Sequence, residues 1–121
     1  IEQRRRIIRW YEQELNGLDQ IVLPREMENS YSAWHLYVIR TIKEQTRLPL
    51  FKHLIKNNIG VNFHYPSVYC HPYYQQRGFG NTRCVMAENY GQTAITLPLY
   101  PSLGRKDVIY ITNVIKNFFK I

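Results

Sequence analysis

The chain has 121 residues, which suits one domain with a modest core, and 45% of them are hydrophobic, a share that argues against a disordered protein. Its apolar runs are short and interrupted by charge, so we expect no membrane span. The net charge of +7 makes an anionic partner plausible, but the basic residues are scattered, and a solvated basic surface explains most of them.

The first residues and the cysteines indicate whether the chain is part of a longer protein and in which compartment it occurs. The chain starts at Ile1 inside a predicted helix and has no signal peptide, so we expect a piece cut from a longer, cytoplasmic protein. Cys70 and Cys84 form neither a disulfide framework nor a zinc signature. Although His64 and His71 lie near Cys70 in the sequence, we expect no metal site.

The first predicted element is a helix over residues 2–17. Apolar residues recur at helical spacing, and Asn16-Gly17 provides a stop because glycine accepts the left-handed conformation. The predicted buried positions are Ile7, Ile8, Tyr11, Leu15 and Leu18, with Trp10 widening the stripe. A short extended segment over residues 21–24 and a polar loop over residues 25–29 follow.

Residues 30–40 predict a strand with apolar bulk on both faces, which is typical of a central strand. One face would carry Trp34, Leu36, Val38 and Arg40, and the other Ala33, His35, Tyr37 and Ile39. We interpret His35 as a buried or half-buried structural histidine and not as a ligand.

The clearest helix is predicted over residues 46–58, with Thr46 as its cap, Pro49 in its first turn and Gly60 marking its end. Its buried stripe would consist of Leu50, Phe51, Leu54 and Ile55. We expect Lys52, His53 and Lys56 to face water.

The stretch from residue 60 to 74 is the candidate functional region. Alternation along a strand over residues 61–66 would place Asn62 and His64 on one face, opposite Val61, Phe63 and Tyr65. Because two polar side chains are costly if merely buried, they fit the rim of a site. Residues 67–80 predict a loop with a helical turn around residues 72–76.

The C-terminal third predicts a helix, a short strand and a final helix. The helix over residues 82–93 would be capped by Asn81 or Thr82, with Val85, Met86 and Tyr90 facing inward. A strand over 95–98 and a helix over 105–120 complete the chain. Helices alternating with short strands predict an α/β (α+β) two-layer sandwich.

Six motifs, in this order and spacing, resemble the C-terminal small domain of the DegT/StrS-type sugar aminotransferases, and the resemblance covers essentially the whole chain. They are Ser32-Ala-Trp-His-Leu-Tyr-Val-Ile-Arg40, Arg47-x-x-Leu-Phe-x-x-Leu54, Asn57-x-Ile-Gly-Val-Asn-Phe-His-Tyr65, Pro72-Tyr-Tyr-x-x-x-Gly78, Ala87-Glu-x-Tyr90 and Leu97-Pro-Leu-Tyr-Pro-Ser-Leu103.

The resemblance implies a fold-type-I enzyme that depends on pyridoxal 5'-phosphate and transfers an amino group, commonly from glutamate, to a keto sugar linked to a nucleotide. The most similar members make 4-amino-4,6-dideoxy sugars for pseudaminic acid, and a homodimer is implied. The resemblance also implies a mostly antiparallel sheet, a linking helix over residues 1–19 and the sandwich over residues 20–121. The Schiff-base lysine and the cofactor site would lie in a large N-terminal domain outside this chain, so we expect the chain to be inactive alone.

Within the family the small domain supplies substrate contacts, and the resemblance points to Asn62, His64, Tyr65 and Tyr69 as substrate-binding residues. The family usually reads His-Tyr-x-Pro-x-His, whereas this chain reads His64-Tyr-Pro-Ser-Val-Tyr69. Tyr69 therefore stands where a second histidine is usual, and it cannot bring a positive charge to a diphosphate.

Two alternative hypotheses come from the composition. The charge of +7 and the ten tyrosines would suit a small nucleic-acid-binding domain, although no binding motif is present and the basic residues do not gather on one element. The second alternative is a purely structural domain in which the aromatic loop forms a protein interface.

Overall fold

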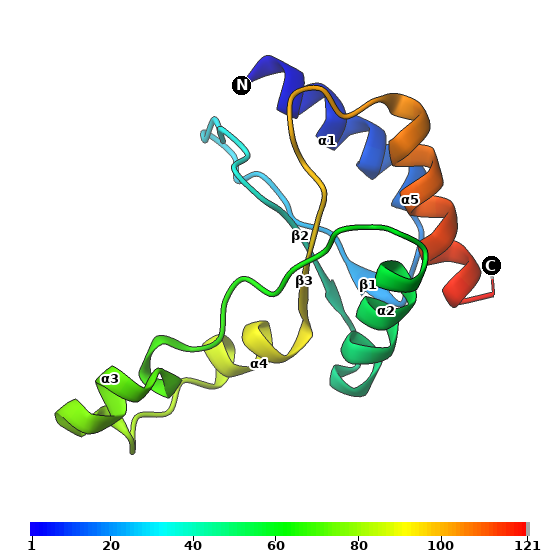
Figure 1. Ribbon diagram of the computed structural model, residues 1–121. Coiled ribbons are helices and arrows are strands. Elements are labelled where there is room, and N and C mark those ends of the chain that lie inside the picture. Colours follow the sequence, from blue (N-terminus) through cyan, green and yellow to red (C-terminus); the bar gives the residue numbers. More distant parts are fainter. Residues whose placement is uncertain (121) are drawn as a thin grey trace.

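The computed structural model describes residues 1–120, and Figure 1 shows helices packed on a small sheet, with one segment projecting from this body. The elements in chain order are α1 (Glu2–Leu15), β1 (Ile21–Val22), β2 (Tyr37–Thr41), α2 (Glu44–Lys56), the 3₁₀ turn η1 (Val68–Cys70), α3 (Pro72–Tyr74), the π-helical turn η2 (Gln75–Phe79), α4 (Val85–Thr93), β3 (Ala94–Leu97) and α5 (Arg105–Phe118). None of the described helices is both long enough and apolar enough to cross a membrane.

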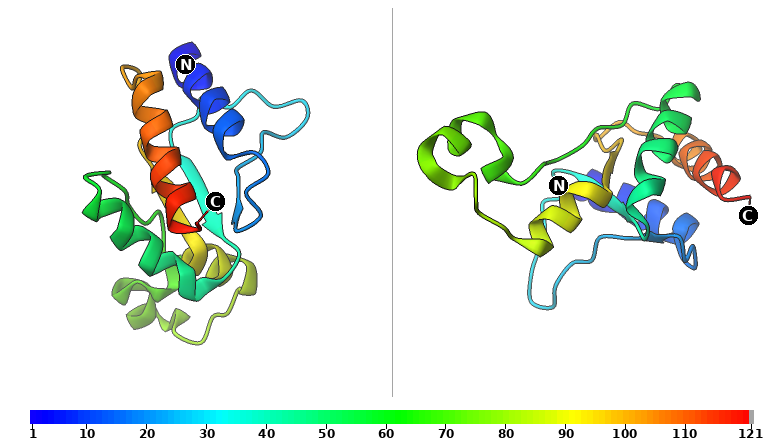
Figure 2. Two further views of the ribbon diagram at one scale, coloured as in Figure 1. Left: turned by 90° about the vertical axis from the view of Figure 1, so that its right-hand side faces the viewer. Right: turned by 90° about the horizontal axis from the view of Figure 1, so that it is seen from below.

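The three strands form one antiparallel sheet in the order β1-β2-β3. Ile21 pairs with Thr41, and Ile39 pairs with Ile95, so β2 is the central strand, as its apolar character predicted. Helix α5 contacts both α1 and α2, and α2 contacts the sheet (Figure 2). This arrangement confirms the predicted α/β sandwich with a short antiparallel sheet.

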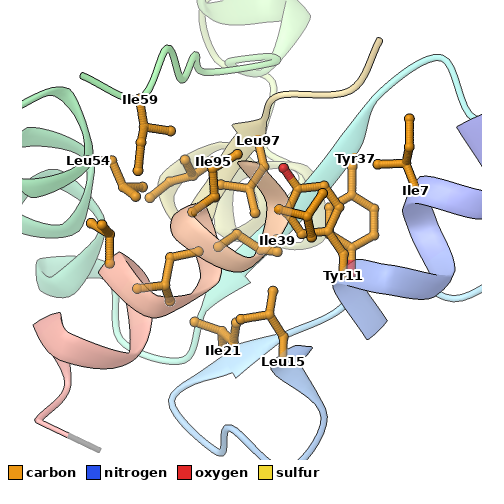
Figure 3. Close-up of a cluster of buried hydrophobic side chains, with 14 of the residues drawn as sticks. Ile7, Tyr11, Leu15, Ile21, Tyr37, Ile39, Leu54, Ile59, Ile95 and Leu97 are labelled. Atoms are coloured by element: carbon orange, nitrogen blue, oxygen red, sulfur yellow. The ribbon is translucent and has the colours of Figure 1, made fainter. Parts of the chain in front are cut away.

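The core lies between the sheet and the helices α1, α2 and α5 (Figure 3). Its fully buried side chains include Ile7, Tyr11, Leu15, Tyr37, Ile39, Leu50, Leu54, Ile95, Leu97 and Ile115. The rings of Tyr11 and Tyr37 stack with centroids 4.7 Å apart and planes inclined by 14°. This stack fixes α1 to the central strand, because both side chains are completely shielded from water.

The two outer helices follow the predicted periodicity. The predicted inward positions of α1 are buried, and the helix ends at Leu15, where Gly17 takes a φ of 80°. In α5 the buried positions are Val108, Ile111, Thr112, Val114 and Ile115. Asp107 accepts a hydrogen bond from the Gly104 N–H at 3.1 Å and so caps the first turn of α5.

The predicted strand over residues 30–40 is wrong before Tyr37. Trp34 has a φ of 49°, and its N–H is bonded to the Ser32 hydroxyl at 3.1 Å. Arg5 on α1 donates to the Glu26 carboxylate at 2.8 Å and to the Ser32 carbonyl at 2.9 Å, and the Ser32 N–H is bonded to Glu26. These contacts hold residues 26–34 as a loop against α1, and His35 is exposed, not buried.

Helix α2 begins two residues before the predicted start. Thr46 is therefore not its cap, because the N-cap residue is Lys43, and Pro49 lies in the second turn. Leu50 and Leu54 are buried as predicted, whereas Ile55 is 47% exposed. His53, predicted to face water, is half-buried with its ring 5.4 Å from that of Phe118.

Asn58, not Gly60, ends α2. Its φ of 57° allows the Ile59 N–H to reach the Leu54 carbonyl at 3.0 Å, while the Asn58 N–H reaches the Ile55 carbonyl at 2.9 Å. This pair of bonds is a Schellman motif, and the buried side chains of Ile59 and Leu54 complete it.

Two predictions on the projecting segment are also wrong. Residues 61–66 do not form a strand, because only Asn62 pairs with the sheet, opposite Thr96. Helix α4 begins at Val85, so neither Asn81 nor Thr82 caps it, and Val85 and Met86 are 77% and 78% exposed. They face outward because the first turn of α4 projects from the body, whereas its later turns pack against α2 and β2 (Figure 1).

Residues 60–92 contain no buried side chain. The predicted helical turn after Pro72 is present as α3 and η2. Figure 1 shows α3 as the part of the molecule farthest from α1 and α5. We refer to residues 65–86 as the arm.

We predict that Tyr11→Phe lowers the free energy of unfolding by about 1–2 kcal/mol, because the Tyr11 hydroxyl donates to the Pro98 carbonyl at 2.9 Å in the core and the acceptor would lose its partner. Tyr37→Phe is the matched control, since its buried hydroxyl has no partner among the described residues and should be removable without loss. Urea unfolding of both variants measures the difference. Equal losses of unfolding free energy in the two variants would show that the Tyr11–Pro98 hydrogen bond does not stabilise the core.

We predict that acid weakens the attachment of the 26–34 loop. The hydrogen bond from Arg5 lowers the pKa of Glu26 from 4.5 to about 2, so the carboxylate stabilises the fold above pH 4.5 and its contribution is lost as the pH falls towards 2. Between pH 5 and pH 2 the melting temperature of Glu26→Gln should fall less than that of the unaltered chain. Glu28→Gln, in the same loop and exposed, should follow the unaltered chain.

Candidate functional site

The imidazole of His64 is bonded to the sheet through one residue, Thr96. Its Nδ1 lies 2.8 Å from the hydroxyl of Thr96 on β3. Two residues earlier, the Asn62 N–H donates to the Thr96 carbonyl at 3.3 Å, and the Thr96 N–H donates to the Asn62 carbonyl at 2.8 Å. Thr96 therefore contacts the backbone of Asn62 and the ring of His64, although the strand from which their shared face was predicted does not form. The amide oxygen of Asn62 accepts a hydrogen bond from the Phe63 N–H at 2.8 Å.

The face of the sheet that carries this contact is the one opposite the core. Ile95 and Leu97 point into the core (Figure 3), so the side chain of Thr96 between them points to the other face, beside its cross-strand partner Val38. Along this face runs an open groove of about 1090 Å³ between α1, β1 and β2, whose lining includes Val38 and Arg40. His64 thus contacts the sheet on the face opposite the core, where Tyr90 of α4 also lines the groove.

Tyr65 points to solvent next to His64. It is 67% exposed, and its ring meets that of His64 edge to face at a centroid distance of 4.7 Å. The peptide bond between the two residues is cis. Tyr65 also lines a hollow of about 600 Å³ that continues along the arm to Tyr73 and Tyr74.

Tyr69 is engaged within the chain. Its hydroxyl donates to the Glu88 carboxylate at 2.6 Å and accepts from the Cys84 N–H at 3.0 Å. These bonds fasten η1 to the first turn of α4. The structure therefore places Tyr69 apart from the pair of Asn62 and His64, in a contact that stabilises the arm.

Arg47 on α2 is a neighbour of the site that the sequence patterns did not identify. Its guanidinium carbon lies 4.2 Å from the ring centroid of Phe63, and its Nη1 donates to the Gly91 carbonyl at 2.8 Å. Phe63 packs on its other side against Phe51 of α2, at 4.3 Å between centroids. Arg47 therefore fastens the segment before His64 both to α2 and to α4.

Gly91 permits a close approach at the same place. A Cβ atom at this position would lie 3.3 Å from the Tyr65 carbonyl oxygen and 3.5 Å from the Cα of Pro66. Any larger residue would push the two backbones apart by a few tenths of an ångström, so a glycine suits the close packing of α4 on the backbone that follows His64.

The six lysines lie on the outside of the domain. Five of them are exposed, and Lys116 is paired with Glu14 at 3.3 Å. None of them lines the groove or the hollow.

Comparison with known proteins gives a consistent result over the whole chain. The model of the DegT/DnrJ/EryC1/StrS aminotransferase family matches residues 1–116. Spore coat polysaccharide biosynthesis protein SpsC of Bacillus subtilis is 29% identical over 98% of this chain and 32% of its own length. A UDP-N-acetyl-3-dehydro-alpha-D-glucosamine 3-aminotransferase of Acidithiobacillus ferrooxidans is 29% identical over 93% of this chain and 29% of its own.

Solved structures share the fold. The putative sugar aminotransferase Spr1654 from Streptococcus pneumoniae, in its PLP form, superposes with a TM-score of 0.89 at 27% identity, over 98% of this chain and 31% of that one. PseC of Helicobacter pylori, an aminotransferase of pseudoaminic acid biosynthesis, has the same fold with a TM-score of 0.88 at 23% identity, over 99% of this chain and 33% of that one. The chain spans about a third of the length of the curated relatives it matches.

We predict that Arg47→Met loosens the segment that carries His64. Loss of the cation–π contact and of the bond to Gly91 should cost about 1–2 kcal/mol, so that the Thr96 amide, which is bonded to Asn62, exchanges its hydrogen about five- to thirtyfold faster. Amide hydrogen exchange measures this protection. Lys52→Met, at an exposed position of the same helix, is the control. Unchanged protection of the Thr96 amide in Arg47→Met would show that Arg47 does not hold the segment that carries His64.

Proposed function

The chain belongs to the DegT/DnrJ/EryC1/StrS aminotransferase family, and on this premise we propose that it is the small C-terminal domain of an enzyme that transfers an amino group to a keto sugar linked to a nucleotide. The match of the family model to residues 1–116 carries this proposal. Two further observations support it: the chain spans about a third of its relatives, and one relative is named for the amination of a UDP-linked sugar. In this proposal residues 1–19 form the linking helix and the rest forms the sandwich.

Pyridoxal 5'-phosphate is the proposed cofactor of the complete enzyme, and a structural neighbour has been solved in its PLP form. When bound, it serves as an electron sink while an amino group is exchanged between donor and acceptor. Because no described lysine lies in a pocket, we assign the Schiff-base lysine to the remainder of the protein and expect this chain to be inactive alone. Glutamate is the proposed donor.

The role we assign to this chain is to form one wall of the substrate site. His64 is half-buried, and its Nδ1 is held by Thr96, so its Nε2 is the ring nitrogen available to a ligand. A histidine in this place can donate a hydrogen bond to a phosphate or sugar oxygen. Asn62 and Tyr65 flank it and complete the proposed wall.

Tyr69 has a different part in this proposal. Its hydroxyl hydrogen is directed to Glu88, so it can offer a ligand only its remaining acceptor capacity, which a diphosphate cannot use. We therefore propose that Tyr69 supports substrate binding by fastening the arm to α4.

A homodimer is the proposed assembly of the complete enzyme. The arm exposes several large apolar side chains, among them Val68, Tyr73 and Phe79, and such a surface is typical of a protein interface. Nucleic acid as a partner has less support, since Arg5, Arg47 and Lys116 are all engaged within the chain.

We predict that His64→Ala in the full-length enzyme raises the KM for a nucleotide-linked 4-keto-6-deoxy sugar by about tenfold or more, since a hydrogen bond to a charged group contributes about 1.5–3 kcal/mol. The KM for glutamate should stay unchanged. Steady-state kinetics with both substrates varied, using the enzyme loaded with pyridoxal 5'-phosphate, measures the two constants.

His35→Ala is the matched control, because this histidine is exposed on the loop before β2 and has no place in the proposed wall. It should leave both KM values as they are. An unchanged KM for the nucleotide sugar in His64→Ala would overturn the proposed wall, and failure of the full-length protein to aminate any nucleotide-linked keto sugar would overturn the proposed reaction.

A further inference from the structure

We infer that Thr96 is the positioning residue of His64, an inference that rests on the proposed role of His64 in substrate binding. The hydroxyl of Thr96 holds the Nδ1 edge of the imidazole at 2.8 Å. It thereby turns Nε2 away from the sheet and towards the ligand.

Thr96 is well suited to this task because it is immobile. All four residues of β3 are buried, and Thr96 itself is only 6% exposed. Its backbone is bonded on one side to Asn62 and is paired on the other with Val38 of the central strand. A β-branched side chain on such a strand has few accessible rotamers, so its hydroxyl occupies a defined position.

The ring of His64 needs such a support because Arg47 and Gly91 position only the backbone on either side of it. The segment around it pairs with the sheet only at Asn62 and lies next to a projecting arm without buried side chains. Among residues 1–120, the Thr96 hydroxyl is the one hydrogen-bonding partner of the imidazole ring. Without it, the half-exposed ring would be free to rotate about two side-chain torsions.

The hydroxyl group also suits both protonation states of the ring. It can donate to an unprotonated Nδ1 or accept from a protonated one, so it orients the neutral imidazole and the imidazolium alike.

The test compares Thr96→Val and Thr96→Ser in the full-length enzyme. Valine keeps the shape but removes the hydroxyl, and we expect the KM for the nucleotide-linked keto sugar to rise about three- to tenfold, as the loss of one hydrogen bond implies, with kcat changed less. Serine retains the hydroxyl and should restore most of the affinity. Thr112→Val is the matched control: this threonine is fully buried, its hydroxyl bonds to the Ile109 carbonyl within α5, and the KM should not change.

A double-mutant cycle separates this inference from the proposed function. If Thr96 acts through His64, Thr96→Val should have no further effect on KM in a His64→Ala background. A raised KM in His64→Ala together with an unchanged KM in Thr96→Val would overturn the positioning role and leave the proposed wall intact. Additive effects of the two substitutions on KM would also overturn the positioning role, since Thr96 would then act independently of His64. An unchanged KM in His64→Ala would overturn the proposed role of His64 in substrate binding.

Discussion

The burial of β3 is the constraint on which both the core and the candidate site depend. Ile95 and Leu97 fill the core between the sheet and the helices, while Thr96 faces the opposite side of the sheet. On that side its hydroxyl holds His64, and its backbone holds Asn62. Because Thr96 is buried, and because β3 pairs with β2 on one edge and with Asn62 on the other, the residue that holds His64 belongs to the packed interior of the domain.

The arm has a different character. Tyr69, Glu88 and the backbone of Cys84 hold it together through local hydrogen bonds, and it contributes nothing to the core. Local unfolding is easiest where few apolar contacts are buried, so the arm should open at a lower free energy than the sheet. Arg47 stands at the boundary between the two regions, since it contacts Phe63 on the segment leading into the arm and Gly91 on the helix leading out of it.

The difference between the buried sheet and the exposed arm supports different proposed roles for the two regions in the enzyme. A half-buried histidine held by a buried residue of β3 can contribute a directed hydrogen bond, whereas the exposed aromatic residues of the arm offer area for packing against another surface. None of the lysines among residues 1–120 lines the groove or the hollow, and the proposal assigns the covalent chemistry to groups outside this chain. The chain is accordingly proposed as one wall of a site and not as a complete site.

Helix and strand periodicity in the sequence determined the elements that pack on the core, because a regular spacing of apolar residues leaves one way to bury them. The burial of α1 and α5 and the central place of β2 were predictable in this way. Tertiary contacts alone decided the rest. The Arg5–Glu26 pair turns the residues before Tyr37 into a loop, and the lack of a packing surface beside the first turn of α4 leaves Val85 and Met86 exposed. Thr96 and Arg47 could not be assigned from the sequence, since each acts on a residue that is distant along the chain, and only folding brings Thr96 to His64 and Arg47 to Phe63.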